Sequence, residues 1–311
     1  MSLSNTQILI ELCALSYCDE DADPFKSITH QEKAIATDIN SGLQQLGLSS
    51  DWSITWGPVL STDIARAFMM YVAGNSSSGE YAVVIRGTDP ASFLGWLRDV
   101  EVSLVAPPYG SGLLIANGAN QAMSTLNAMT SGGQTVVQYL TSLSGSPTFY
   151  VTGHSFGGTL ATAYAPWLVA QGVGSPQVMT FAAPSAGNAA FVTYLLANVA
   201  SVTSYINTLD VVPNLWANIE GIERYYASPG PACPKLITIL LNNFAKNVTG
   251  FEQPVTPTSL TGTLQSSDTW FQEVGYQHDH NTYAGLLGAP ELSIDELEIQ
   301  TFLATRTPKA A

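Results

Sequence analysis

Apolar residues recur along the chain with the spacings of regular secondary structure, and helix-type segments alternate with strand-type segments. A spacing of three to four residues predicts a helix, and alternating or continuous apolar residues predict a strand. The predicted helices are 3–18, 29–47, 117–142, 155–171 and 187–199, and the predicted strands are 51–60, 67–73, 81–86, 149–152, 177–183 and 201–207. This alternation predicts an α/β fold with a mainly parallel central sheet flanked by helices.

The distribution of charge along the chain locates the expected interior. Residues 159–209 contain no Asp, Glu, Lys or Arg, so we expect this stretch to form the buried centre of the sheet. Residues 214–275 are less regular and rich in Pro, Thr and Ser, which suggests a cap-like excursion over one face. Because no segment has the composition of a linker, residues 1–311 are predicted to form a single domain.

Composition excludes several functional classes. Charged residues make up only 11% of the chain, compared with about 25% in an ordinary soluble domain, so a disordered chain is excluded. The formal net charge of −14 argues against nucleic acid as a partner and against polybasic docking on anionic membranes. No apolar run approaches the roughly 18–20 residues that span a bilayer, so no transmembrane segment is expected.

The first residues lack the basic region of a signal peptide, and Glu11 interrupts their apolar stretch. The expected location is therefore the cytoplasm, or outside the cell if the native N-terminus is longer. Three cysteines, Cys13, Cys18 and Cys233, cannot all pair, and they are expected to be buried or free thiols. No Cys/His spacing resembles a metal site, and no cofactor is expected.

The segment Gly153-His154-Ser155-Phe156-Gly157 follows an apolar strand and precedes a helix of small residues. This is the G-x-S-x-G pattern in the strand–turn–helix context that it requires. A serine on so sharp a turn has a strained backbone, so the residues two positions away must be small. Its hydroxyl then stands above the sheet edge, beside a helix N-terminus that favours negative charge. Ser155 is the predicted nucleophile.

A serine nucleophile needs a histidine to accept its proton. The chain has four histidines: His30, His154, His278 and His280. The first lies far upstream on a predicted helix surface, and the ring of the second cannot reach its neighbour's hydroxyl. We favour His278, because it is expected in a loop, whereas His280 is expected in the first turn of a helix capped by Asp279. His280 remains the alternative.

The acid that orients the base should lie between the serine and the histidine in chain order. Only Asp210 and Asp268 are aspartates in that interval. Asp210 follows the predicted strand 201–207, at the strand end where such folds display catalytic groups. Asp268 has the context of a helix cap. Asp210 is therefore the predicted acid.

The strand 81–86 ends in Arg86-Gly87-Thr88. On this kind of fold an upstream strand end supplies one amide of the oxyanion hole, and the residue after the nucleophile supplies the other. Thr88 and Phe156 are therefore the predicted oxyanion-hole residues.

Five motifs occur together and in order: 86–88 (Arg-Gly-Thr), 96–99 (Trp-Leu-Arg-Asp), 153–158, 181–188 and 207–213. Together they resemble the class 3 (fungal-lipase-like) lipases, over about residues 65–290. The resemblance implies an α/β-hydrolase fold, a Ser-Asp-His triad acting on carboxylic esters, and a hydroxyl-bearing residue that caps the oxyanion. It also implies a mobile apolar lid, here within 89–115.

The chain departs from that family in two respects. Fungal members are often secreted and disulfide-bonded, and this sequence shows neither feature. The final histidine of the family usually stands a few residues before an aromatic residue, and here His280 is three and His278 five residues before Tyr283.

The expected function is that of a serine carboxylic-ester hydrolase, a lipase or esterase that acts on neutral esters through an acyl-enzyme. Its expected partner is a small neutral ester or lipid, with a transient lipid interface as a further possibility. Alternatives are an aryl-ester (feruloyl-type) esterase, a phospholipase A1-like enzyme, an amide hydrolase, acyl transfer to alcohols, and a non-catalytic binding module of the same fold.

Overall fold

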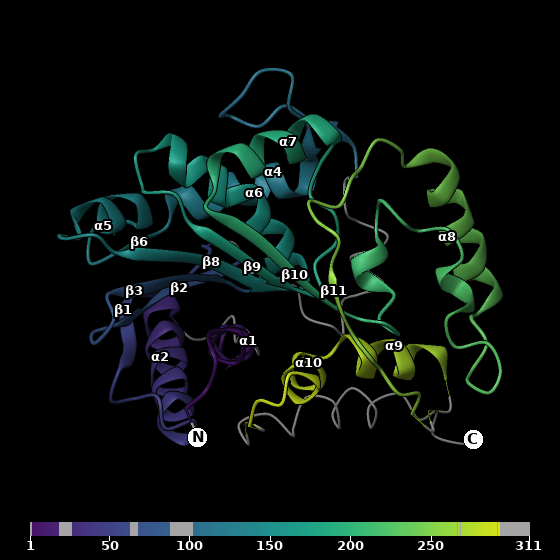
Figure 1. Cartoon of the computed structure of the whole chain (residues 1–311), viewed down its shortest axis with the longest axis horizontal. Coiled ribbons are helices and arrows are strands. Elements are labelled where there is room, and N and C mark those ends of the chain that lie inside the picture. The colour runs from purple at the N-terminus through teal and green to yellow at the C-terminus, as the bar shows by residue number, and fades with distance from the viewer. Residues whose placement is uncertain are drawn as a thin grey trace.

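The computed structural model describes residues 2–18, 27–62, 68–87, 102–265, 267, 269–290 and 292. Its centre is a seven-stranded sheet with the order β1-β2-β3-β8-β9-β10-β11 (Figure 1). The strands are β1 (Trp52–Leu60), β2 (Met69–Asn75), β3 (Glu80–Ile85), β8 (Thr148–His154), β9 (Gln177–Phe181), β10 (Ser201–Asn207) and β11 (Thr258–Leu260). Strands β1 to β3 pair antiparallel and the remaining neighbours pair parallel, which confirms the predicted mainly parallel sheet.

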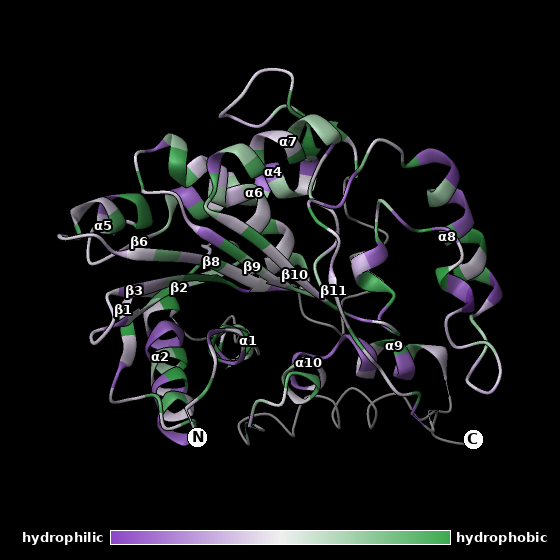
Figure 2. Cartoon of the chain, in the orientation of Figure 1, coloured by the Kyte–Doolittle hydropathy of each residue, from purple (hydrophilic) through white to green (hydrophobic). Residues whose placement is uncertain are grey.

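Helices cover both faces of this sheet, and a separate apolar cluster lies under each layer (Figure 1). One face carries α4 (Asn117–Ala128), α5 (Val136–Ser142), α6 (Phe156–Ala170) and α7 (Ala189–Asn198). The other face carries α1 (Asn5–Leu15), α2 (Ile28–Gln45), α9 (Trp270–His278) and α10 (His280–Leu286). Figure 2 shows hydrophilic and hydrophobic residues alternating along α2, as expected of a helix with one solvent-facing side. The arrangement is the α/β-hydrolase fold implied by the sequence motifs.

Helix α6 is buried along almost its whole length, as its lack of charged residues predicts. Helix α1 lies within the predicted helix 3–18, and every residue from Ile8 to Leu15 is buried, including Glu11. It packs against β8, β3, β9 and α10. Helix α2 starts at Ile28 and not at the predicted Thr29, because Ser27 is its N-cap.

The predicted helix 117–142 is wrong, because the structure has two helices there. A short hairpin separates α4 from α5, formed by β6 (Thr130–Ser131) and β7 (Gln134–Thr135). The turn residues Gly132 and Gly133 have φ angles of 57° and 79°. A pair of left-handed glycines favours a two-residue hairpin turn, and it outweighs the apolar spacing on either side.

The excursion after β10 contains more regular structure than the sequence indicates. It begins with the 3₁₀ turns η2 (Val212–Asn214) and η3 (Ile222–Arg224), followed by α8 (Lys235–Asn247) and then β11. These elements enclose a third apolar cluster beside the sheet. Only part of the predicted lid 89–115 lies within the described residues, where β4 (Leu104–Val105) pairs with β5 (Ile115–Ala116).

Cys13, Cys18 and Cys233 form no disulfide; the first two are buried and the third is half-buried. No helix among the described residues has both the length and the apolar character needed to cross a membrane.

Candidate active site

Ser155 occupies the sharp turn between β8 and α6, and it is 8% exposed. Its backbone has φ 57° and ψ −133°, a conformation that non-glycine residues rarely adopt. The first turn of α6 starts at the next residue, so the helix N-terminus lies beside the hydroxyl. Strain held at one such position is a feature of functional sites.

Two glycines make this turn possible. A Cβ on Gly157 would lie 2.8 Å from the Gly87 amide nitrogen and 2.9 Å from the Arg86 carbonyl carbon, and it would also collide with the Ile85 carbonyl oxygen. A Cβ on Gly153 would collide with the backbone of Gly157. The structure thus agrees with the steric reason for small residues on both sides of the serine.

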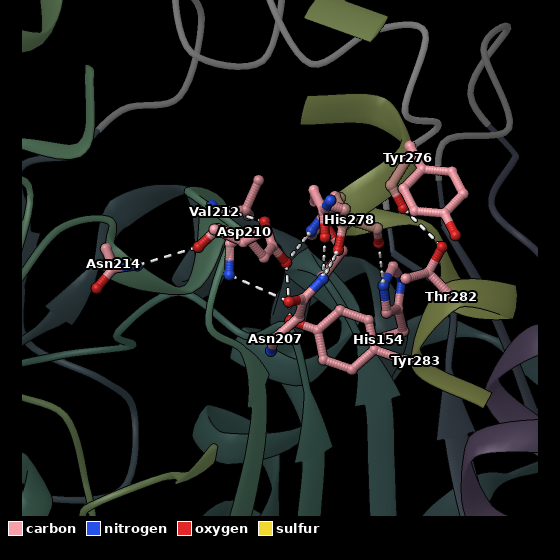
Figure 3. A network of polar contacts seen from close by, with 12 residues as sticks. His154, Asn207, Asp210, Val212, Asn214, Tyr276, His278, Thr282 and Tyr283 are labelled. Carbon is pink, nitrogen blue, oxygen red and sulfur yellow. Dashed lines mark hydrogen bonds and ion pairs between the residues drawn. The ribbon is translucent and has the colours of Figure 1, made fainter. Parts of the chain in front are cut away.

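His278 lies between Ser155 and Asp210, and Figure 3 shows it beside Asp210. Its Nε2 lies 2.7 Å from the Ser155 Oγ, and its Nδ1 lies 2.8 Å from the Asp210 Oδ2. A carboxylate only accepts hydrogen bonds, so Nδ1 carries the proton and Nε2 is left to accept one from the serine hydroxyl. The three residues favoured by the sequence are therefore brought together in the order that proton transfer requires.

Asp210 is fully buried and each of its carboxylate oxygens is bonded. The Val212 amide donates to Oδ1 at 2.9 Å, and the Tyr283 hydroxyl donates to Oδ2 at 2.8 Å. Burial, the largest effect, and the neighbouring Asp210 carboxylate both raise the pKa of Tyr283 well above its ordinary value, so this hydroxyl keeps its proton. Sequence reasoning assigned Tyr283 only to an apolar helix face, and its spacing from the histidines was the one signal of a closer role.

The local structure around His278 differs from the predicted loop. His278 is the last residue of α9, so Gly275 and Gln277 belong to a helix. The prediction for the next residue is confirmed, since Asp279 caps α10 by accepting from the Asn281 amide at 2.7 Å. The extended backbone of Asp279 separates the two helices, and His278, at the end of α9, bonds to Ser155 and Asp210.

A buried polar network holds α9 to the end of β10. The Asn207 Nδ2 donates to the carbonyl oxygen of Gln277 at 2.9 Å and to its Oε1 at 2.7 Å. The Gln277 Nε2 donates to the Glu273 Oε1 at 2.7 Å and to the Thr263 carbonyl at 2.8 Å. Because Asn207 is three residues before Asp210 and Gln277 one residue before His278, the network fixes the acid and the histidine relative to each other. Neither Asn207 nor Gln277 was assigned a role from the sequence.

The other histidines lie where they cannot replace His278. His154 is buried, and its ring bonds to the Tyr17 hydroxyl and to the His278 carbonyl oxygen. His280 lies in the first turn of α10, with its ring 5.0 Å from that of Tyr17 and its Nδ1 3.4 Å from the Asp279 Oδ1. His30 is exposed on α2, as expected.

The predicted oxyanion hole is described only in part. Phe156 directly follows Ser155 and is the first residue of α6. Thr88 lies outside the described residues, as does Asp268, the rejected candidate for the acid. Gly87 lies against the serine turn, because a Cβ built on it would be 3.2 Å from the Ser155 Cβ.

The structure offers no alternative centre with comparable chemistry within its described part. A hollow of about 450 Å³ lies between residues 102–104 and the C-terminal half of α8, and none of Ser155, Asp210 and His278 lines it. No group of three or more His, Cys, Asp or Glu side chains among the described residues is arranged to hold a metal ion.

Comparisons with known proteins agree with this geometry. Residues 82–219 match the family model of the lipases (class 3), a range that includes Ser155 and Asp210. The structure of M37 lipase aligns over 97% of this chain and 100% of its own chain, with a TM-score of 0.84 and 24% sequence identity. The structure of the Rhizomucor miehei lipase–propeptide complex aligns over 92% of this chain and 83% of its own, with a TM-score of 0.56 and 20% sequence identity.

A third structure, of a triacylglycerol lipase whose catalytic centre is a serine protease triad, covers 68% of this chain with 72% of its own, at a TM-score of 0.50 and 23% identity. No curated protein sequence matches.

Fold, site and comparisons together define a carboxylic ester hydrolase of the α/β-hydrolase fold. The family match over residues 82–219 agrees with the resemblance stated from the sequence motifs, because this part of the chain is similar to the class 3 lipases.

Proposed function

We propose that the protein hydrolyses neutral carboxylic esters through an acyl-enzyme formed on Ser155. The observation that carries this proposal is the pair of hydrogen bonds on His278, one to the serine hydroxyl and one to the buried carboxylate of Asp210. This arrangement converts a weak hydroxyl nucleophile into a reactive one, because the proton leaves as the new bond forms.

In acylation the Ser155 Oγ bonds to the ester carbonyl carbon while its proton passes to the His278 Nε2. Asp210 stabilises the imidazolium that results, through the bond to Nδ1. The oxyanion is held by the amide of Phe156 and, as the sequence predicts, by Thr88. The bond between the carbonyl carbon and the alcohol oxygen then breaks, and the departing alcohol takes the proton from Nε2.

Deacylation repeats these steps with water in place of the serine hydroxyl. Water gives a proton to the His278 Nε2 as its oxygen bonds to the acyl carbon, and Ser155 leaves as an alcohol that regains that proton. No metal ion enters either half-reaction, because the proton transfers and the oxyanion bonds are supplied by side chains and amides.

Neutral esters are the favoured substrates for electrostatic reasons. A chain with a net charge of −14 repels polyanionic substrates and anionic surfaces. The match to a lipase family supports acylglycerols or simple carboxylic esters as substrates. Feruloyl-type aryl esters share the same chemistry and are the main alternative to be separated by experiment.

The testing experiment has two arms. A fluorophosphonate probe should label the wild-type protein at Ser155, identified by mass spectrometry of the modified peptide. A panel of p-nitrophenyl esters of increasing acyl length, a feruloyl ester, a phospholipid and an amide analogue should then give the highest kcat/KM for a neutral ester. Absence of labelling would favour a non-catalytic module, and preference for the amide would move the enzyme to another class.

A further inference from the structure

Five aromatic and imidazole rings gather beneath the serine turn: Tyr17, His154, His278, His280 and Tyr283. The His154 ring is central, with its centroid 4.8 Å from that of His278, 5.7 Å from Tyr283 and 5.8 Å from Tyr17. It is 2% exposed. The reaction proposed above uses His278 and leaves His154 without a role, although it directly precedes the nucleophile.

Both ring nitrogens of His154 are bonded, one to His278 (Figure 3) and one to Tyr17, and these partners determine where the proton lies. The Nε2 is 2.8 Å from the His278 carbonyl oxygen, which can only accept, so Nε2 carries the proton. The Nδ1 is 3.0 Å from the Tyr17 hydroxyl and must accept from it in the neutral ring. The His278 carbonyl therefore sets the tautomer, and the Tyr17 hydroxyl, which also lies 3.4 Å from the His154 carbonyl oxygen, stabilises it by donating to Nδ1.

The ring stays neutral in this setting. Burial, followed by the proximity of His278 and then of His280, lowers the pKa of His154 well below its ordinary value, although the bond to the His278 carbonyl opposes the shift. Neutrality suits the reaction, because a charged His154 would repel the proton that His278 must accept from Ser155.

The bond from His154 meets a specific need at the end of α9. The last carbonyl groups of a helix have no partner within the helix, and His278 is the last residue of α9. Two consecutive carbonyl oxygens there accept from outside the helix: that of Gln277 from the Asn207 Nδ2, and that of His278 from the His154 Nε2. The donors sit at the ends of β10 and β8, the strands that lead to the acid and to the nucleophile.

These contacts close a ring of bonds around the site. From the Ser155 Oγ the path runs to the His278 imidazole, along its backbone to the carbonyl oxygen, across to the His154 ring, and back to Ser155 through one peptide bond. A displacement of His278 away from Ser155 would lengthen the 2.7 Å bond between its imidazole and the serine hydroxyl. If its backbone moved as well, the 2.8 Å bond from His154 to its carbonyl oxygen would also lengthen.

We propose that His154, in the tautomer that Tyr17 stabilises, is a positioning residue that holds the backbone of His278 where its imidazole can reach the Ser155 hydroxyl. This inference rests on the proposed function, because it assigns His278 the role of base. His154 contacts no substrate in this scheme and acts only through His278.

The test compares two substitutions at the same position. His154→Leu removes the donor but keeps an apolar side chain, and it should lower kcat by about 10²-fold with KM changed less than about twofold, the size expected for a misplaced catalytic group. His154→Gln carries an amide that can donate from near the position of Nε2, and it should recover at least tenfold of that loss. His280→Leu is the matched control within the same ring cluster and should cost less than about tenfold. Thermal unfolding reports whether each variant is folded.

A measurement on the wild-type protein keeps the proposal testable even if the variants do not fold. The ¹⁵N chemical shifts of His154 distinguish a protonated from an unprotonated ring nitrogen, and they should show the proton on Nε2. In Tyr17→Phe the tautomers should mix and kcat should fall several-fold.

A proton on Nδ1 in the wild-type protein would overturn the proposal. So would a folded His154→Leu variant with wild-type kcat, or equal losses in kcat for His154→Leu and His154→Gln. If the wild-type protein neither reacts with fluorophosphonate nor cleaves esters, the proposed function fails instead, and the ¹⁵N result still reports on the bond.

Discussion

Tyr283 and His278 donate to the same oxygen of Asp210, each at 2.8 Å. The Tyr283 hydroxyl in turn accepts from the Asn207 amide at 2.9 Å, so it links the end of β10 to the carboxylate. Tyr283→Phe removes the donor while keeping the ring. We expect kcat to fall about 3- to 10-fold with little change in KM, and the free energy of unfolding to fall by about 1–3 kcal/mol because the Asn207 amide loses its partner. Steady-state kinetics and urea unfolding measure the two effects, and unchanged kcat would show that Val212 and His278 suffice to orient Asp210.

Ser155→Ala should lower kcat by about 10⁴-fold or more, because only oxyanion stabilisation and binding remain when a triad member is lost. The fold should be kept, since alanine fits where serine does, and the far-ultraviolet circular dichroism spectrum should match that of the wild-type protein. Substantial ester hydrolysis by this variant, measured after a fluorophosphonate wash to remove contaminating hydrolases, would end the proposed mechanism.

The two neighbouring histidines give a sharper comparison. His278→Ala should be as inactive as Ser155→Ala, and the double variant no worse than either single one, because residues that act as a unit do not add. His280→Ala should cost less than about tenfold, since its ring packs against Tyr17 and its Nδ1 faces Asp279 rather than the serine. Reversed results would make His280 the base, in a conformation other than the one described here.

Two glycines with opposite surroundings test the serine turn. Gly157→Ala places a Cβ against the backbone of residues 85–87, which cannot move aside as a flexible side chain could. We expect a loss of at least 10²-fold in kcat together with a lower melting temperature. Gly275→Ala, on α9, has open space around its Cβ and should leave activity unchanged while raising stability by up to about 1 kcal/mol. Equal behaviour of the two variants would argue against a steric requirement at the turn.

Glu11 makes the stability of the fold depend on pH. It is fully buried and neither carboxylate oxygen has a hydrogen-bond partner among the described residues. Burial raises its pKa from about 4.5 to about 8, so between these values the folded state keeps a proton that the unfolded state has lost. Stability should therefore be fully present below about pH 4.5 and should fall as the pH rises through 8, by up to about 1.4 kcal/mol per unit.

Glu11→Gln removes this titration. Urea unfolding of both proteins at several pH values between 5 and 9 gives the difference, which should grow in favour of the variant as the pH rises. Parallel curves would mean that the carboxyl group finds a partner in solution.

The broad fold could be predicted from the sequence because strand and helix periods in this chain are clear and the stretch without charges is buried. The errors have local physical causes. At 117–142 the apolar spacing predicted one helix, whereas Gly132 and Gly133 impose a turn. The first helix was predicted, but the burial of every residue from Ile8 to Leu15, Glu11 included, was not. Helix α8 was missed within a segment whose Pro, Thr and Ser content resembles a loop.

Within the site, elimination over four histidines and two aspartates selected residues that the structure brings within hydrogen-bond distance of each other. That argument works because few residue types can move a proton near neutral pH. The elimination argument did not identify the residues that hold the catalytic side chains in place. Asn207, Gln277 and Tyr17 lie on different elements, and their roles depend on distances that no sequence spacing encodes.

Helix α1 and the turn after it contact the serine strand β8 along its length. The Asn5 Nδ2 donates to the Tyr150 hydroxyl at 3.0 Å, the Cys13 Sγ lies 3.3 Å from the Thr152 Oγ1, and the Tyr17 hydroxyl reaches His154. The N-terminal end of α1 is also tied to the segment after α10, where the Gln7 Nε2 donates to the carbonyl oxygens of Leu287 and Gly288. The first helix and the turn after it thus connect the strand that carries the nucleophile to the segment that follows α10. A truncation that removes residues 4–18 would delete the contacts to His154 and to the segment after α10, and so should lower activity as well as stability. A purification tag at this end therefore needs a spacer that leaves these residues intact.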